Sequence, residues 1–457
     1  MTVNPADSEI FGSLYGTDDM RDVFSDRRLV RHMLEVEAAL ARVEAGLGII
    51  PTHAADAIER AAASMPLDLA ELAASARLVG YPVVGVAKAL GRAAGEDAAR
   101  YVHWGATTQD IVDTALVLQI REGLALVDGH LRKVLAALAR QAVAHRDTVM
   151  AGRTFLQQAL PITFGYKCAV WLAPLLSHLE RLRELRPRVL KVQLGGAVGT
   201  LASLGGHGHA VTIGLAEQLG LGVPDAPWHV ARDGLVEVAA FLGLICGSLA
   251  KLAGDVILLM QTEVAEVFEP HEPGRGGSST LPQKRNPIAS AYVVAAARGA
   301  HALIPLMFGA MAQDHERATG AWQSEQLALP QIFVLTAGAL AHAAEICEGL
   351  TVDVGRMREN LDLTNGLIMA EAVMMALAEK VGREAAHRVM QAASGIALRE
   401  RRPLAEVLQE ETLVRDNFES AMLARLADPA YYLGEAREVV DRVLARAGDY
   451  LDAARDD

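Results

Sequence analysis

Apolar residues recur at helical spacing along most of the chain. Residues 25–44 begin with a Ser-Asp pair suited to a helix N-terminus, and their apolar positions follow the spacing of an amphipathic helix: Leu29, Met33, Val36, Leu40 and Val43. The apolar-polar alternation of strands is scarce, so we predict an all-α protein in which sheet is a minor component. Further long helices are predicted over residues 113–145, 163–185, 232–263, 287–311 and 330–348.

The predicted helices are longer in the middle of the chain than at its ends. The five long ones would have roughly 20–30 residues each, well above the usual dozen, and they predict a long central bundle. Prolines interrupt shorter helical segments on both sides of it. The chain of 457 residues also exceeds the usual single domain of ~100–200 residues. We therefore predict three domains: an N-terminal helical domain 1–110, a central helix bundle 111–350 and a C-terminal helical domain 351–457.

The hydrophobic content of 51% is high and has to be buried somewhere. Apolar stretches such as residues 238–250 fall short of the ~20 residues that a membrane span requires, and Glu237 and Lys251 flank this one. Outside a membrane, a helix that is apolar on most faces is buried by other helices, including those of partner subunits. We therefore expect an oligomer and no membrane partner.

Charge and cysteine content narrow the class of protein further. The net charge is −13, and no basic run interleaves with aromatic residues, so we expect no nucleic-acid partner. The N-terminus lacks the apolar region of a signal peptide, which predicts a cytoplasmic protein. The three cysteines stand far apart in apolar surroundings and are expected to be buried, reduced thiols: Cys168, Cys246 and Cys347.

Residues 276–287, GGSSTLPQKRNP, place hydroxyl groups, a cation and an amide in one segment. Gly276 and Gly277 give the backbone freedom to close over a ligand, and the two prolines stiffen the far end. The segment is either a catalytic lid loop, which we place near residues 271–287, or a polar surface loop.

A second polar run, residues 101–110 with the sequence YVHWGATTQD, precedes a predicted helix. Free backbone amides and the helix dipole favour an anion at such a helix N-terminus, so a substrate carboxylate could bind there. The alternative is an ordinary capping turn in which Thr108 or Asp110 satisfies its own helix. His103 could hydrogen-bond a carboxylate or act as an acid toward a leaving group.

Three arginines are candidate carboxylate ligands. Arg153 is followed by Thr154 and Gln157, which add a hydroxyl and an amide. Arg232 is either a capping partner of Asp233 or a carboxylate clamp. Arg317 lies in the run DHER, which is either a salt-bridged helix terminus or part of a site.

The sequence gives little support for a metal or phosphate site. His207 and His209 have no cluster of carboxylates or cysteines beside them, and no His-Glu-x-x-His run occurs. The glycine-rich residues 195–200 lack a following lysine, so we interpret them as a close-approach turn. We expect no metal.

Several of these motifs together resemble the fumarase/aspartase superfamily, and most of all its 3-carboxy-cis,cis-muconate cycloisomerases. The resemblance includes GSS-x-x-P-x-K-x-NP in the lid loop, the HWGATTQD run, and residues 20–26, 266–270 and 360–366. Thr108 stands where serine is usual, and Leu281 where methionine is common. Phe155 stands where many relatives that expel an amine or hydroxide have histidine, and Gln158 also replaces another polar residue or histidine.

The resemblance implies a fold, an assembly and a set of site residues. The fold would be a three-domain one whose central five-helix bundle associates into the twenty-helix core of a homotetramer, with each active site built from three subunits and no cofactor. The catalytic residues would be Ser278, which exchanges a proton with the carbon α to a carboxylate, Lys284, which stabilises the developing charge, and His103. The implied substrate-binding residues are Thr107, Thr108, Gln109, Arg153, Thr154, Gln157, Gln158, Arg232, Ser279, Asn286 and Arg317.

The activity implied by the resemblance is closure of 3-carboxy-cis,cis-muconate to carboxymuconolactone in protocatechuate breakdown. Phe155 agrees with this and equally with nitrite release, because a carboxylate with a pKa near ~4 departs without a proton whereas an amine or alkoxide does not. The same residues suit a lyase that releases fumarate from a substituted succinate with a good leaving group such as nitrite, or a C–N lyase. A structural tetramer without activity is a third hypothesis, and the intact set of Ser278, Lys284 and Asn286 argues against it.

Overall fold

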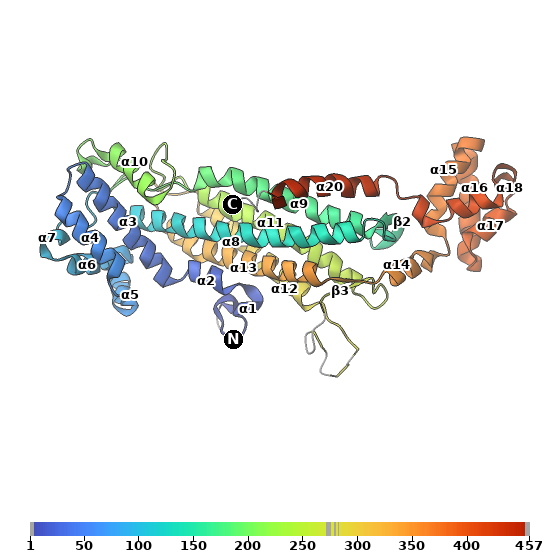
Figure 1. Ribbon diagram of the computed structural model, residues 1–457, viewed down its shortest axis with the longest axis horizontal. Helices are drawn as coiled ribbons and strands as arrows, with labels where there is room; N and C mark the ends of the chain where they lie inside the picture. The colour runs from blue at the N-terminus through green and yellow to red at the C-terminus, as the bar shows by residue number, and fades with distance from the viewer. Residues whose placement is uncertain (1–3, 271–275, 278–279, 282, 453–457) are drawn as a thin grey trace. The chain divides into compact units, whose positions relative to one another are not determined.

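The computed structural model describes residues 4–270, 276–277, 280–281 and 283–452. Helices make up 71% of the protein, which confirms the predicted all-α class. The five long helices also appear where the apolar periodicity predicts them: α8 Thr108–Ala144, α9 Phe164–Val189, α11 Asp233–Leu259, α12 Ile288–Gly309 and α13 Ala321–Gly349 (Figure 1). We predicted that α13 begins at Pro330, because proline is favoured in a first helical turn. The helix begins instead at Ala321. In the structure the helix continues through Pro330.

Contacts divide the chain into two compact units. The first comprises Met1–Leu131, Ser177–Ala250 and Tyr292–His342. The second comprises Arg132–Leu176, Lys251–Ala291 and Ala343–Asp457. Each of the five long helices contributes residues to both units. The division into domains 1–110, 111–350 and 351–457 stays a prediction.

The first unit contains the N-terminal helices. They are α1 Gly12–Tyr15, α2 Asp18–Val23, α3 Asp26–Gly46, α4 Thr52–Ser64, α5 Leu69–Val79, α6 Val83–Ala94 and α7 Glu96–Ala99, and α10 Gly208–Leu219 packs against α3. The Ser25 hydroxyl caps α3 by accepting a hydrogen bond from the Arg28 amide at 3.2 Å. A continuous apolar core joins α3–α7 and α10 through fully buried residues such as Met33, Leu40, Ile58 and Leu90.

The second unit holds the strands and the C-terminal helices. Strands β1 Val149–Thr154 and β2 Gln157–Thr163 form an antiparallel hairpin, and β3 Val267–Phe268 pairs with β4 Thr351–Val352. The C-terminal helices are α14 Val354–Leu361, α15 Ala370–Val381, α16 Arg383–Glu400, α17 Leu404–Glu410, α18 Thr412–Asn417, α19 Ser420–Leu426 and α20 Ala436–Asp452 (Figure 1). Leu377, Met390 and Leu404 belong to a separate core formed by α15–α19.

Three long helices are more apolar than the sequence analysis allowed for. By length and composition alone α11, α12 and α13 could each cross a membrane, so the prediction that the apolar stretches are too short for a span is wrong. The protein itself buries 61% of the most apolar window of α11 and 67% of that of α13, but only 28% of that of α12. Helix α12 is therefore the one whose apolar surface needs a further partner.

The three cysteines are buried, as predicted, and none of them forms a disulfide. Burial raises the pKa of Cys246 to about 11 and that of Cys347 to about 12, and it raises the pKa of Cys168 as well. The thiols therefore remain protonated at neutral pH.

Candidate functional site

The turn before α8 is tied to the glycine-rich loop by the buried carboxylate of Asp110. One oxygen accepts hydrogen bonds from the backbone amides of Thr107 and Gly196, both at 2.9 Å. The other accepts from the Gly195 amide at 2.9 Å and from Nε2 of His229 at 2.7 Å. Asp110 thus caps its own helix and also fixes the loop beside it, as a capping carboxylate at the third helical position can.

Arg317 lies against this same turn. Its Nη1 donates to the Thr107 hydroxyl at 2.9 Å, and its Nη2 donates to the carbonyls of Gly196 and Ala197 at 3.3 and 3.1 Å. Among the described residues it forms no ion pair, and Asp314 instead accepts from the Thr319 amide. The structure therefore brings Arg317 and Thr107 together and leaves the positive charge of Arg317 without a carboxylate.

Thr108 and Gln109, the next two predicted site residues, begin α8. Thr108 is half-buried, whereas Gln109 is 1% exposed. The Gln109 side-chain amide donates to Asp113 at 3.0 Å and to the His229 carbonyl at 2.9 Å. Both hydrogen bonds of this nitrogen are thus made inside the protein, and they join the start of α8 to the backbone at His229.

His103 lies in the same turn and pairs with a residue that the sequence analysis did not single out. Its Nδ1 is 2.6 Å from Oε1 of Glu37, a carboxylate on α3 that is 1% exposed. The sequence does contain a feature that could have identified Glu37: Glu37 and Glu44 occupy the apolar face of the predicted helix, where acidic residues are rare.

Arg232 is fully buried, and its guanidinium is occupied on both sides. It donates to the two oxygens of Asp113 at 2.6 and 3.0 Å and to those of Glu325 at 2.8 and 2.5 Å. The Trp228 ring lies 4.9 Å from the guanidinium carbon. Neither role considered for Arg232, a cap for Asp233 or a clamp for a substrate carboxylate, describes this arrangement. The fifth N–H points to the Trp228 carbonyl at 3.5 Å, so no donor remains for a ligand and the side chain is a buried structural cation.

In the second unit, Arg153 is also paired. Its Nη1 and Nη2 donate to the two oxygens of Glu266, which is fully buried, at 2.9 and 2.6 Å. Asn360 donates to the same carboxylate at 2.8 Å, and Gln158 donates to the Asn360 carbonyl at 2.6 Å. The structure thus joins Arg153 and Gln158 in one network around Glu266. Glu266 neutralises the charge of Arg153, so this arrangement does not support the expected role of Arg153 as a ligand for a substrate carboxylate.

The β1–β2 hairpin presents the residues between Arg153 and Gln158 to solvent. Thr154 pairs with Gln157, so Phe155 and Leu156 form a two-residue turn with φ of 50° and 63°. Such turns normally use Asn and Gly, because both central residues need positive φ. In this chain Phe155 takes one of these two positions, and its side chain is 98% exposed. The position that distinguishes this chain from amine-expelling relatives therefore lies at the tip of a hairpin.

The base of the lid loop is closed by Asn286. Its backbone amide and its side-chain amide both donate to the Gly276 carbonyl, at 3.1 and 2.9 Å, and Gly277 forms a β-bridge with Arg285. Lys284 is exposed. Ser278 and Ser279 lie outside the described residues.

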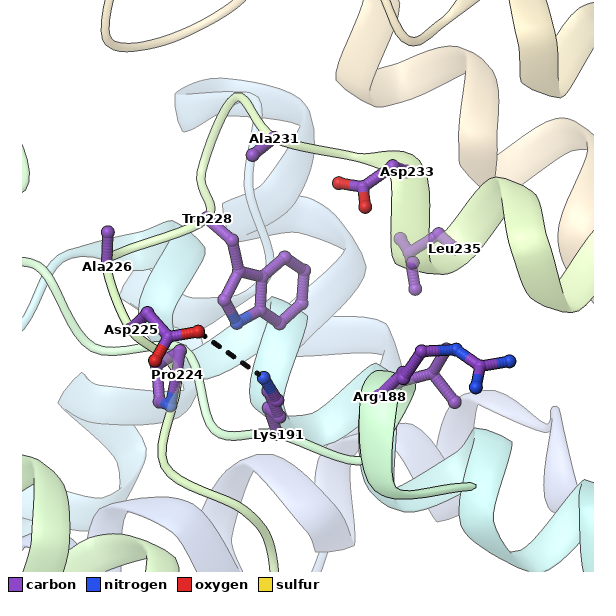
Figure 2. A pocket seen from close by; sticks show the side chains of 11 residues that line it. Arg188, Lys191, Pro224, Asp225, Ala226, Trp228, Ala231, Asp233 and Leu235 are labelled. Atoms are coloured by element: carbon purple, nitrogen blue, oxygen red, sulfur yellow. Dashed lines mark ion pairs between the residues drawn. The ribbon is translucent and has the colours of Figure 1, made fainter. Parts of the chain in front are cut away.

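The pocket shown in Figure 2 lies elsewhere in the first unit and has a volume of about 190 Å³. Trp228 and Leu235 form part of its wall, and Lys191 pairs across it with Asp225 at 4.0 Å. It shares no residue with the predicted site. Within the described ranges, no group of His, Cys, Asp and Glu could hold a metal ion.

Glu44, one residue of the same apolar face as Glu37, yields a prediction about stability. It is fully buried without a hydrogen-bond partner, and burial together with the charge of Glu37 raises its pKa to about 8. In the unfolded chain an ordinary glutamate loses its proton near pH 4.5, so between these pH values the folded state holds the extra proton. Stability therefore falls with rising pH by up to roughly 1.4 kcal/mol per pH unit. Glu44→Gln should remove this slope, as unfolding in urea at pH 5–8.5 would show.

The matched control is Glu96→Gln, which changes an exposed glutamate in α7. It should leave the pH dependence of unfolding as in the wild type. Parallel pH profiles for wild type and Glu44→Gln would show that Glu44 does not carry this extra proton.

Comparison with known proteins finds relatives that match nearly the full length of the chain. A family model described as "Lyase" matches residues 15–300, and one described as "Adenylosuccinate lyase C-terminus" matches residues 366–443. A 3-carboxy-cis,cis-muconate cycloisomerase of Pseudomonas aeruginosa is 51% identical over 96% of both chains. The crystal structure of the 3-carboxy-cis,cis-muconate lactonizing enzyme of Pseudomonas putida is 45% identical, with a TM-score of 0.92 over 97% of this chain and 100% of that one. That of a fumarate lyase from Mesorhizobium sp. BNC1 is 46% identical, with a TM-score of 0.90 over 94% and 98%. The chain therefore belongs to the fumarase/aspartase superfamily of lyases, and it is similar over nearly its full length to 3-carboxy-cis,cis-muconate cycloisomerases.

Proposed function

We propose that the protein is a cofactor-independent cycloisomerase that closes 3-carboxy-cis,cis-muconate to carboxymuconolactone in protocatechuate breakdown. The full-length likeness to the Pseudomonas aeruginosa cycloisomerase supports this activity. That likeness is the observation that carries the proposal, and Phe155 agrees with it because it places no acid at the hairpin tip. A carboxylate joins and departs without a proton, so lactone formation needs none there.

In the proposed mechanism, a carboxylate oxygen of the substrate adds across the conjugated double bond. Negative charge then grows on the carboxylate next to the reacting carbon, and Lys284, Asn286 and Thr108 hold this aci-carboxylate. Ser278 delivers the proton to the carbon, with loop amides and Lys284 stabilising its alkoxide. In reverse, the same steps form a β-elimination. The unpaired charge of Arg317 makes it the preferred ligand for a further carboxylate.

We also propose a cytoplasmic homotetramer in which three subunits build each active site. The poorly covered apolar surface of α12 supports an oligomer, since helices of partner subunits would bury it.

The likeness to a fumarate lyase favours a second candidate, a lyase that forms fumarate from a substituted succinate. The test follows the ultraviolet absorbance of 3-carboxy-cis,cis-muconate with purified enzyme, beside fumarate formation from nitrosuccinate and aminosuccinate. Rapid loss of the diene that disappears in Ser278→Ala is the expected result. A stable diene with fumarate formation would identify the lyase instead, and silence in both assays would overturn the two enzyme proposals.

A further inference from the structure

A buried carboxylate lies directly behind His103. Glu37 is 1% exposed, and its Oε1 is 2.6 Å from Nδ1 of His103, whose side chain is 23% exposed. The other oxygen of Glu37 is buried and has no hydrogen-bond partner among the residues that the structure describes. The imidazole is therefore the group to which this carboxylate is bound.

The electrostatics of the pair favour a cationic ring. Burial by itself lowers the pKa of His103, but the hydrogen bond and charge of Glu37, with a smaller contribution from the charge of Asp110, outweigh it and raise the pKa. A buried carboxylate needs a paired charge, and a doubly protonated imidazole supplies one through Nδ1. The proton on Nε2 then has no acceptor among the described residues, because the Glu37 contact is the hydrogen bond that His103 makes.

The backbone places this ring beside the candidate site at a cost. His103 has a φ of 62°, in the left-handed region that residues with a Cβ seldom adopt. The turn continues through Gly105 to Thr107, whose hydroxyl accepts from Arg317. His103 therefore belongs to the same turn that Arg317 contacts through Thr107.

We propose that Glu37 is a positioning residue that orients the imidazole of His103 and keeps both of its nitrogens protonated, so that Nε2–H binds a carboxylate of the substrate. This inference rests on the cycloisomerase proposed above, and it assigns His103 a role in binding rather than proton donation. Glu37 occupies Nδ1 alone, so Nε2–H remains as a donor for one of the three carboxylates of the substrate.

The test measures the protonation of His103 directly. Diethyl pyrocarbonate modifies neutral imidazole, so the rate of His103 modification between pH 5 and 9, followed by peptide mass spectrometry, reports its titration. Glu37→Gln should move the midpoint to lower pH and speed the reaction at pH 7, because the ring loses the hydrogen bond and the charge that stabilise its second proton. Glu44→Gln is the matched control, since it removes another buried carboxyl group of α3 and should leave the midpoint unchanged.

Kinetics separate positioning from a general structural role. Glu37→Gln should raise KM for 3-carboxy-cis,cis-muconate about tenfold with a smaller effect on kcat, and adding it to His103→Gln should cause no further loss. Glu37→Asp, which keeps the charge, should restore part of the loss and serves as the second variant if Glu37→Gln fails to fold. An unmoved midpoint, or additive losses in the double variant, would overturn the proposal. A shifted midpoint in a protein that leaves the diene intact would support the pairing and refute the cycloisomerase.

Discussion

Replacing Arg232 by methionine should lower the free energy of unfolding by about 3–5 kcal/mol, because it leaves two buried carboxylates without a counter-charge. Asp113 and Glu325 each use both oxygens on this guanidinium, and both are at most 2% exposed. Hydrophobic packing by methionine replaces part of the side-chain volume but none of the four charge-assisted hydrogen bonds. Urea unfolding at fixed protein concentration measures the effect.

A matched control for this substitution is Arg188→Met. Arg188 also forms an ion pair, with Glu237 of α11, but both side chains are well exposed, at 54% and 39%. Its loss should cost under about 1 kcal/mol, because solvent already screens the pair. Equal effects of the two substitutions would show that burial does not determine the contribution of Arg232.

Replacing Arg317 by methionine should lower kcat/KM roughly a hundredfold, about 2.7 kcal/mol of transition-state stabilisation. Within the part of the chain that the structure describes, the guanidinium contacts neutral oxygens alone, from Thr107, Gly196 and Ala197, so its charge is free to act on a carboxylate. Steady-state kinetics on 3-carboxy-cis,cis-muconate measures the loss, and urea unfolding shows whether the variant folds as the wild type does.

Arg317→Lys should retain part of the activity, because it keeps the charge but loses the planar fork of donors. Arg188→Met, in which an ion-paired surface arginine is changed, should keep normal kcat/KM. Normal turnover by Arg317→Met would remove Arg317 from the site.

The helices could be predicted because their signal is local. Apolar spacing within one helix located α3 and the five long helices, and it failed mainly where a proline lies inside α13. The β1–β2 hairpin was missed because Phe155 and Leu156 carry no turn signal: the residues that accept positive φ readily are glycine and asparagine.

The site could be predicted only in part, because pairing of charges depends on distant residues. The motif around Arg232 reads like that of a ligand-binding arginine, yet its partners Asp113 and Glu325 lie 119 and 93 positions away. Arg153 and Glu266 are 113 positions apart in the same way. Thr107 and Arg317, by contrast, were both expected at the site, and the structure places them in contact. Sequence motifs therefore identified the groups with suitable chemistry but could not show which of them the protein neutralises itself.

The exposed tip of the β1–β2 hairpin is a position where the sequence can change at little cost in stability. Phe155 is 98% exposed in this chain, and the conformation of its turn is set by the backbone pairing of Thr154 with Gln157. A different side chain at this position would disturb no core packing, because surface substitutions away from special contacts change stability little. A lineage could therefore exchange the residue at position 155 without first acquiring compensating mutations in the fold.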